Sequence, residues 1–197
     1  MFSTLFKSID ERVRLTDQEK ELCKQFFIPR KLRKRQYLLQ QGDVCRVNAF
    51  VEKGLLRAYT VDEKGNEHVI QFAAEGWWIS DLYSFLTGET SDYNIEALED
   101  CELLLLSSSA SEELLAALPK FESYQRMLLQ GAYIAMQRRI TSALKMTAEE
   151  RYLKVVGDYP QITQRVPQHM IASYLGITAE TLSRIRKQLI HPDNPLI

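Results

Sequence analysis

The chain has 197 residues, of which 45 % are apolar and 26 % are charged, the balance of an ordinary globular protein. This length allows one large domain or two small ones. No run of about 18 uncharged apolar residues occurs, and the first residues carry charges where a signal peptide has its apolar centre. We therefore expect no membrane partner and a cytoplasmic protein.

The net charge of −1 hides an asymmetry along the chain. Residues 1–110 contain 14 Lys and Arg against 18 Asp and Glu, a net charge of −4, and residues 111–197 contain 11 against 8, a net charge of +3. A mildly basic second part is compatible with nucleic acid as a partner, although the signal is weak by itself.

The cysteines Cys23, Cys45 and Cys101 are odd in number, widely spaced and outside any metal-ligand pattern. They are expected to be small buried hydrophobes with free thiols. The three histidines are scattered, and no Ser/His/Asp grouping or phosphate loop accompanies them. The sequence therefore predicts no metal, no cofactor and no catalytic residue.

The first part of the chain changes from a helical to a β-strand pattern. Residues 15–27 are predicted to form a helix, because Thr16 and Glu19 have the spacing of a capping box. From residue 35 to 107, short β-rich runs are separated by glycines, and residues 61–66 have the composition of a hairpin loop. Strands of this length and spacing are typical of an antiparallel barrel or a jelly roll.

Helical patterns return after residue 109. A short helix over 111–118 is followed by a long one over 119–146, which Pro119 is suited to begin. The long helix carries two apolar stripes, so both faces need a cover. The first stripe contains Phe121, Tyr124, Leu128, Ala132, Ala135 and Met146, and the second contains Leu129, Tyr133, Met136 and Ile140. One face is expected on the barrel. The other is expected on the same helix of a second subunit, with Ala132 and Ala135 allowing a close approach; the alternative is burial inside one domain.

A break in the helical pattern is predicted at residues 145–148. Thr147 is suited to cap a helix over 148–159, with Glu150 as its capping-box partner. Such a break can be a hinge between two domains or a rigid corner.

Residues 166–189, VPQHMIASYLGITAETLSRIRKQL, have the pattern of a helix-turn-helix. Two helices, 167–175 and 179–190, flank Gly176, where the turn needs an unhindered backbone. Thr178 is placed to cap the second helix. Leu182, Ile185 and Leu189 are expected to face inward, while Ala179, Glu180, Ser183, Arg184 and Lys187 face outward.

The outward residues suit reading of double-stranded DNA. Arg184 can bond the O6 and N7 atoms of guanine, and Glu180 can accept from the N4 amine of cytosine. Phosphate contacts are expected from Thr178, Thr181 and Lys187, and Gln168 and His169 are predicted to lie near the DNA as well. The alternative for Glu180 and Arg184 is an i,i+4 ion pair within the helix.

The chain resembles the Crp/Fnr family over almost its whole length, through residues 37–72, Ser109–Met146 and, most specifically, the helix-turn-helix. The resemblance implies an α+β fold with three parts. These are an N-terminal β-roll (a double-stranded jelly roll like a cyclic-nucleotide-binding domain) over 1–118, a long dimerisation helix over 119–146, and a winged-helix-like helix-turn-helix domain over 147–197. The wing is expected to be reduced. Ala179 stands where the family's cyclic-AMP receptor has a base-contacting arginine, which implies a different operator.

The effector region departs from the family pattern. Ser80-Asp81 stands for the family's Gly-Glu, Ser91-Asp92 stands for its Arg-Ser, and no arginine occurs between Arg57 and Arg126. A cyclic phosphate without a cation there would be strongly disfavoured, so no cyclic nucleotide is expected. The resemblance places the candidate effector pocket at Trp78, Ser80, Asp81, Leu82, Ser91, Asp92, Tyr93, Met136 and Gln137.

The sequence thus predicts a homodimeric, DNA-binding transcription regulator with operator DNA, a second copy of itself and RNA polymerase as partners. The alternative is a cyclic-nucleotide or other small-molecule sensor whose ligand controls DNA binding. The missing arginine separates the two hypotheses.

Overall fold

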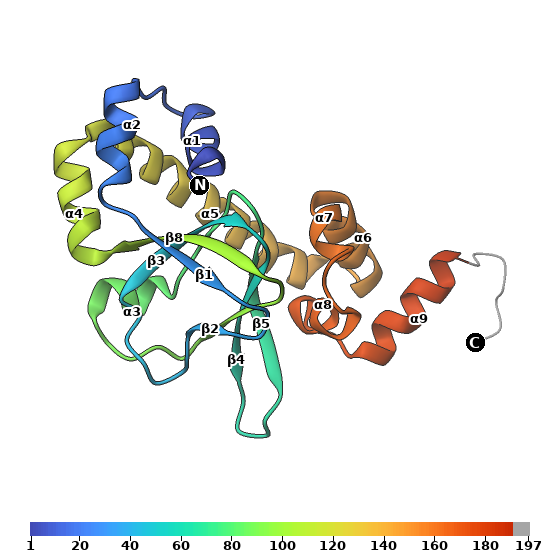
Figure 1. Ribbon diagram of the computed structural model, residues 1–197. Coiled ribbons are helices and arrows are strands. Elements are labelled where there is room, and N and C mark those ends of the chain that lie inside the picture. The colour runs from blue at the N-terminus through green and yellow to red at the C-terminus, as the bar shows by residue number, and fades with distance from the viewer. Residues whose placement is uncertain (191–197) are drawn as a thin grey trace.

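The computed structural model describes residues 1–190 and consists of a β-roll, a long helix and a helical C-terminal domain (Figure 1). The roll is built from two four-stranded antiparallel sheets, with strand orders β1-β8-β3-β6 and β2-β7-β4-β5. Its strands are β1 (Ile28–Leu32), β2 (Tyr37–Leu39), β3 (Val47–Lys53), β4 (Leu56–Val61), β5 (Glu67–Ala73), β6 (Trp78–Ile79), β7 (Asn94–Ala97) and β8 (Cys101–Ser107). This confirms the predicted jelly roll.

Helices lie beside the roll, and further helices form the C-terminal domain. They are α1 (Ser3–Asp10), α2 (Asp17–Lys24), α3 (Leu82–Thr87), α4 (Ser108–Ala117), α5 (Pro119–Lys145), α6 (Ala148–Asp158), α7 (Pro160–Thr163), α8 (Gln168–Leu175) and α9 (Ala179–Ile190). The capping boxes predicted at Thr16–Glu19 and Thr147–Glu150 are both formed. The expected reduced wing falls outside the described residues.

Five elements were not predicted: α1, β1, β6, α3 and α7. Each is short, and none shows a clear period of apolar residues. Helix α1 depends on a tertiary contact, because the buried carboxylate of Glu52 on β3 accepts the backbone N–H groups of Thr4 and Leu5 at its first turn. Strand β1 lies at the sheet edge and pairs with β8, although its sequence IPRKL contains a proline and two cations.

The space between the two sheets is filled by small and branched apolar side chains, among them Val51, Leu56, Ile95 and Leu103. Gly54 allows β3 and β4 to turn beside this core. Its φ is +101°, and a Cβ atom there would lie 2.6 Å from the sulfur of Cys101. All three cysteines are buried and free, as predicted, and burial raises the pKa of Cys23 to about 12 and that of Cys101 to about 11.

A second core lies between the sheet containing β3 and β8 and the helices α1, α2, α4 and α5. Only the first part of α5 contributes: Phe121 and Tyr124 are buried and Leu128 is half-buried. Every residue from 131 to 141 is exposed. The apolar residues of the second stripe are therefore open to solvent in one chain, with exposed fractions of 54 % for Leu129 and 56 % for Ile140.

This exposure contradicts the alternative in which α5 is buried inside one domain. Ala132 and Ala135, which we expected to allow close approach of a second helix, are exposed as well. The helix contributes to the second core only as far as Leu128 and then extends toward the C-terminal domain (Figure 1).

A third core joins the C-terminal domain to the outer face of β4 and β5. Apolar residues of the roll, such as Tyr59 and Phe72, pack with Ile162, Ile171 and other residues of α7 and α8. Ser173 adds two hydrogen bonds, donating to the carbonyl of Glu67 and accepting from the N–H of Val69, at 2.7 and 2.9 Å. The β-roll and the C-terminal domain are thus in direct contact, in addition to being joined through α5.

No helix within residues 1–190 is both long enough and apolar enough to cross a membrane.

Candidate nucleic-acid interface

The turn between α8 and α9 is built as the sequence predicted. Gly176 ends α8 in the left-handed region with a φ of 68°, and the N–H of Ile177 donates to the carbonyl of Ala172 at 3.0 Å. Thr178 then caps α9, since its hydroxyl accepts from the N–H of Thr181 at 3.2 Å. These bonds fix the angle at which α9 leaves the turn.

Two of the three predicted anchors of α9 face the core. Leu182 and Ile185 are 1 % and 6 % exposed, and Leu182 packs with the buried Ile171 and Ala172 of α8. The prediction for Leu189 is wrong, because this side chain is 38 % exposed. Helix α9 projects away from the domain (Figure 1), so its last turns have no neighbouring helix to bury them.

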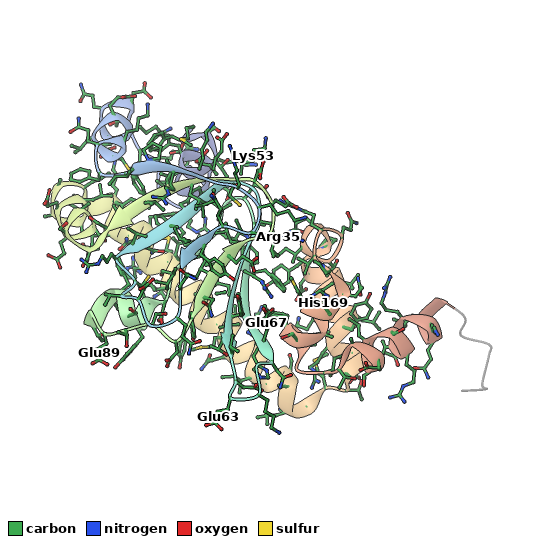
Figure 2. All side chains as sticks on the ribbon, turned by 60° about the horizontal axis from the view of Figure 1, so that its bottom comes forward. Arg35, Lys53, Glu63, Glu67, Glu89 and His169 are labelled. Carbon is green, nitrogen blue, oxygen red and sulfur yellow. The ribbon has the colours of Figure 1, made fainter. Side chains whose placement is uncertain are left out.

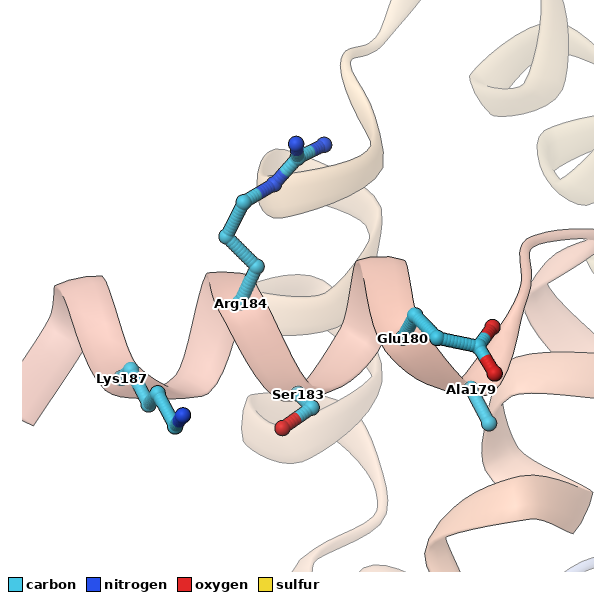
Figure 3. Close-up of a pocket in the computed structure, with 5 residues that line it drawn as sticks. All are labelled: Ala179, Glu180, Ser183, Arg184 and Lys187. Carbon is cyan, nitrogen blue, oxygen red and sulfur yellow. The ribbon is translucent and has the colours of Figure 1, made fainter. Parts of the chain in front are cut away.

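The outward face of α9 forms a shallow concave surface (Figure 3). It is lined by Ala179, Glu180, Ser183, Arg184 and Lys187, five of the residues predicted to contact DNA. All five are exposed. Their side chains spread from the helix at different angles, with Arg184 pointing away from Ser183 and Lys187 in this view.

Glu180 and Arg184 do not form an ion pair within residues 1–190, which disfavours the purely intrahelical explanation of this charge pair. The pKa of Glu180 is lowered, first by its own backbone N–H and then by the hydroxyl of Thr178. Its carboxylate is therefore charged at neutral pH, as an acceptor for a base amine must be.

The remaining predicted contacts lie around this surface. His169 and Thr178 are exposed, whereas Gln168 and Thr181 are half-buried. Gln168 lines an adjoining concavity together with Arg186 and four other residues of α9. Arg186 was missed from the sequence, although it is an exposed cation two residues after Arg184 on the same helix.

The structure brings only part of the predicted effector pocket together. Asp81 is buried, and its carboxylate accepts from the hydroxyl of Ser91 at 2.7 Å and from the N–H groups of Tyr83 and Ser84 at the start of α3. Ser91 in turn accepts from the N–H of Tyr93. The pKa of Tyr93 is raised by burial first and by Asp81 second.

The other predicted pocket residues lie elsewhere or face solvent. Trp78 belongs to the second core, where its Nε1–H donates to the hydroxyl of Tyr124 at 3.1 Å and its ring packs on Phe50. Ser80 is half-buried beside Asp81. The rest of the predicted pocket is exposed, namely Leu82, Asp92, Met136 and Gln137. The pattern of the sequence could not show that Trp78 turns toward α5.

Within the part of the chain that the structure describes, no group of three or more His, Cys, Asp or Glu side chains is placed to hold a metal ion.

Comparison with known proteins supports this architecture. Residues 29–117 match the model of the cyclic nucleotide-binding domain. The Fumarate and nitrate reduction regulatory protein of Vibrio cholerae is 26 % identical over 167 residues, 78 % of this chain and 65 % of that relative. The chain therefore resembles regulators of the Crp/Fnr family in sequence and fold. It spans slightly less than two thirds of the length of this curated relative.

Solved structures share the Crp/Fnr fold with this chain. The c-di-GMP responsive global regulator CLP of Xanthomonas campestris has a TM-score of 0.74 at 16 % identity, covering 90 % of this chain and 93 % of its own. The Catabolite Activator Protein of Thermus thermophilus has a TM-score of 0.56 at 22 % identity, covering 94 % and 87 %. At these identities the likeness concerns the fold alone.

Proposed function

We propose that this protein is a sequence-specific, DNA-binding transcription regulator of the Crp/Fnr family that acts as a homodimer in the cytoplasm. One observation supports this most strongly. The outward face of α9, which includes Glu180, Ser183, Arg184 and Lys187, is exposed on a helix that Thr178 caps and that Leu182 and Ile185 anchor. A second helix of a helix-turn-helix that is fixed in this way can enter a major groove.

Each side chain has a proposed role in that groove. Arg184 reads a guanine edge, and Glu180 accepts from a cytosine amine. Ala179 and Ser183 contribute contacts with base edges over short distances. Phosphate contacts come from Thr178, Thr181, Lys187, Gln168 and His169, which position the helix without reading sequence.

The dimer is proposed to form along the exposed part of α5. Leu129, Tyr133, Met136 and Ile140 are each more than half exposed in a single chain, and the exposed Gly131, Ala132 and Ala135 allow a second helix to approach closely. An apolar helix face of this length is costly to leave in water. RNA polymerase is a proposed further partner, with no residue assigned to it.

The effector domain is proposed to act without a cyclic phosphate. The buried carboxylate of Asp81 already takes the N–H groups at the start of α3 and the hydroxyl of Ser91. A phosphate there would meet a like charge without a cation. The alternative, a cyclic-nucleotide sensor, is tested by calorimetry with cyclic AMP and cyclic GMP, where saturable binding would support it.

Selection from random double-stranded DNA tests the central proposal. The intact protein is expected to enrich a pseudo-palindromic site with two half-sites about one turn apart. Arg184→Ala should lose this enrichment, whereas Leu189→Ala, an exposed position on the same helix, should retain it. If the intact protein enriches no sequence, the proposal is wrong.

A further inference from the structure

Strand β5 lies at the edge of its sheet, and α8 packs beside that edge. The hydroxyl of Ser173 on α8 donates to the carbonyl of Glu67 at 2.7 Å and accepts from the N–H of Val69 at 2.9 Å. Figure 2 shows Glu67 at the edge of the roll beside α8, the helix that carries His169. A hydroxyl that both donates to and accepts from the same strand is fixed in direction as well as in distance. We call this contact the Ser173 clamp.

The part of β5 that Ser173 bonds is itself held in place. The carboxylate of Glu67 pairs with the guanidinium of Arg57 on β4, whose side chain is only 6 % exposed. Arg57 also donates to Glu96 on β7 at 2.7 Å, and its guanidinium lies 4.0 Å from the centre of the Tyr59 ring in the third core. The beginning of β5 is therefore a firm support for the Ser173 clamp.

A second polar contact lies beyond the other end of β5. Arg165, in the segment between α7 and α8, donates to both carboxylate oxygens of Glu99 at 2.9 and 2.6 Å. It also donates to both oxygens of Glu75 at 2.8 and 3.1 Å, and Glu75 accepts in addition from the N–H of Gly54 at 2.8 Å. A planar guanidinium that bonds carboxylates through two atoms each is held in one orientation. We call this contact the Arg165 clamp.

The two clamps differ in kind from the apolar contact that joins the same surfaces. In the third core, the rings of Phe72 and Tyr174 lie 5.5 Å apart. Those of Trp77 and Tyr159 lie 5.4 Å apart. Apolar burial holds surfaces together but is not directional, so by itself it allows one surface to turn on the other. Two clamps separated by a strand of 7 residues, about 20 Å, prevent that rotation.

The angle of the C-terminal domain on the roll decides where α9 lies relative to α5. Phe121 and Tyr124 of α5 are buried against the roll, so the roll and the first part of the long helix form one body. The clamps join the C-terminal domain to that body. In a dimer formed along α5, they therefore set the separation and the angle of the two α9 helices.

We propose that the Ser173 clamp and the Arg165 clamp determine the spacing of the two DNA half-sites that the dimer accepts. This inference rests on the proposed function and on the dimer proposed along α5. One added base pair moves a half-site by about 3.4 Å along the duplex and turns it by roughly 35°. A domain that is held at one angle cannot follow this movement. Ser173 and Arg165 are thus positioning residues that act through the placement of α9.

The test uses a series of duplexes that carry the same two half-sites at different spacings. The half-site is the one that selection from random DNA enriches, and the centre-to-centre spacing runs in single steps from about 8 to about 13 base pairs. The loss of a cation weakens binding at every spacing alike. The shape of the spacing profile is therefore the readout, and the bases selected within each half-site report that the C-terminal domain is folded.

The variant Ser173→Ala/Arg165→Gln removes both clamps. Thr163→Ala/Lys154→Gln is the matched control. It removes a hydroxyl that donates to a backbone carbonyl of its own helix, α7, at 3.1 Å, and a cation that pairs with Asp158 on α6 at 3.0 Å. The control thus loses the same kinds of groups from the C-terminal domain without losing either clamp.

The wild-type protein and the control are expected to prefer one spacing, with affinity falling about tenfold for each base pair added or removed, because the DNA must then be twisted or bent to fit. Ser173→Ala/Arg165→Gln should flatten this profile to less than about threefold per base pair and select the same bases in each half-site. Ser173→Ala alone should give an intermediate profile.

A double variant that keeps the wild-type profile overturns the inference, as does a wild-type protein that binds all spacings equally. A wild-type protein that enriches no half-site contradicts the proposed function, and the inference with it.

Discussion

The guanidinium of Arg139 on α5 lies 4.1 Å from the centre of the Tyr174 ring on α8 and donates to the Tyr174 carbonyl at 3.0 Å. The same group also donates to the carbonyls of Val69 and Ile70 on β5. One side chain thus connects the long helix, the β-roll and the C-terminal domain. The outward face of α9 stays exposed in this arrangement, so the contact holds the C-terminal domain in place without covering that face.

Arg139→Ala is expected to destabilise the contact between the domains by about 1–2 kcal/mol, from charged hydrogen bonds and one cation–π contact at a partly exposed site. Amide exchange in α8 and β5 should accelerate. Operator affinity should fall, because α9 is then less well oriented for binding. Arg138→Ala is the matched control, since Arg138 is an exposed neighbour of equal charge. Unchanged exchange in Arg139→Ala would contradict this role.

The ion pairs of Arg165 predict a loss of stability in acid. Arg165 donates to Glu75 at 2.8 Å and to Glu99 at 2.6 Å, across the interface between the roll and the C-terminal domain. The pKa of Glu99 is lowered mainly by Arg165; for Glu75 burial opposes this, but the net pKa is still lowered. Depressed carboxylate pKa values stabilise the fold above the unfolded value and lose that contribution as pH falls through the folded one.

Stability measured by urea unfolding should therefore decrease below about pH 4.5, where unfolded glutamates begin to bind protons. Arg165→Gln should lower stability at pH 7 by about 1 kcal/mol, since these side chains are partly exposed, and should flatten the acid dependence. An acid dependence in Arg165→Gln equal to that of the wild type would assign the effect to other carboxylates.

Thr147 begins α6 directly after the break at Met146, where the backbone is extended. Thr147→Ala removes the cap and is expected to cost about 1 kcal/mol. If the break is a hinge, operator affinity of the full-length protein should change as well. Thr16→Ala removes an equivalent capping box on α2 and is the control. If both variants change operator affinity equally, the break at Met146 is a rigid corner and not a hinge.

The proposed dimer is tested at Ile140, which is 56 % exposed in the single chain. Ile140→Asp should convert a dimer to a monomer at micromolar concentration in sedimentation experiments, because a buried, unpaired carboxylate at the interface is strongly unfavourable. Leu86→Asp changes an even more exposed apolar residue on α3 and should leave the dimer intact. A wild-type monomer at these concentrations would reject the dimer itself.

Arg184 and Lys187 are both cations of the outward face of α9, but they should fail differently. Arg184→Ala should cost about 1–3 kcal/mol on the operator and much less on random DNA, because its planar fork fits two acceptors of guanine. Lys187→Ala should weaken binding to both DNAs equally and reduce the salt slope by about 1. Binding curves at several salt concentrations measure both. If Arg184→Ala leaves the ratio of operator binding to random-DNA binding unchanged, the assignment of base reading to Arg184 on α9 is wrong.

Local chemistry in the sequence determined the helix-turn-helix and the boundaries of the long helix. Gly176 must adopt a positive φ, Thr178 and Thr147 cap the helices that follow them, and Pro119 suits a first turn. These are short-range requirements, so the residue types reveal them directly. The pattern of short β-rich runs separated by glycines likewise predicted the β-roll.

The tertiary structure alone decided which surfaces meet. Trp78 was predicted to line an effector pocket but packs on Phe50 and bonds Tyr124, since a strand of two residues gives no period from which its face can be read. Leu189 was predicted to be buried but is exposed, because no element within residues 1–190 covers the end of α9. Nothing in the sequence distinguishes Arg139 and Arg165 from ordinary surface cations. Their partners lie 35 to 90 positions away along the chain, and only the packing of the domains brings those groups within bonding distance.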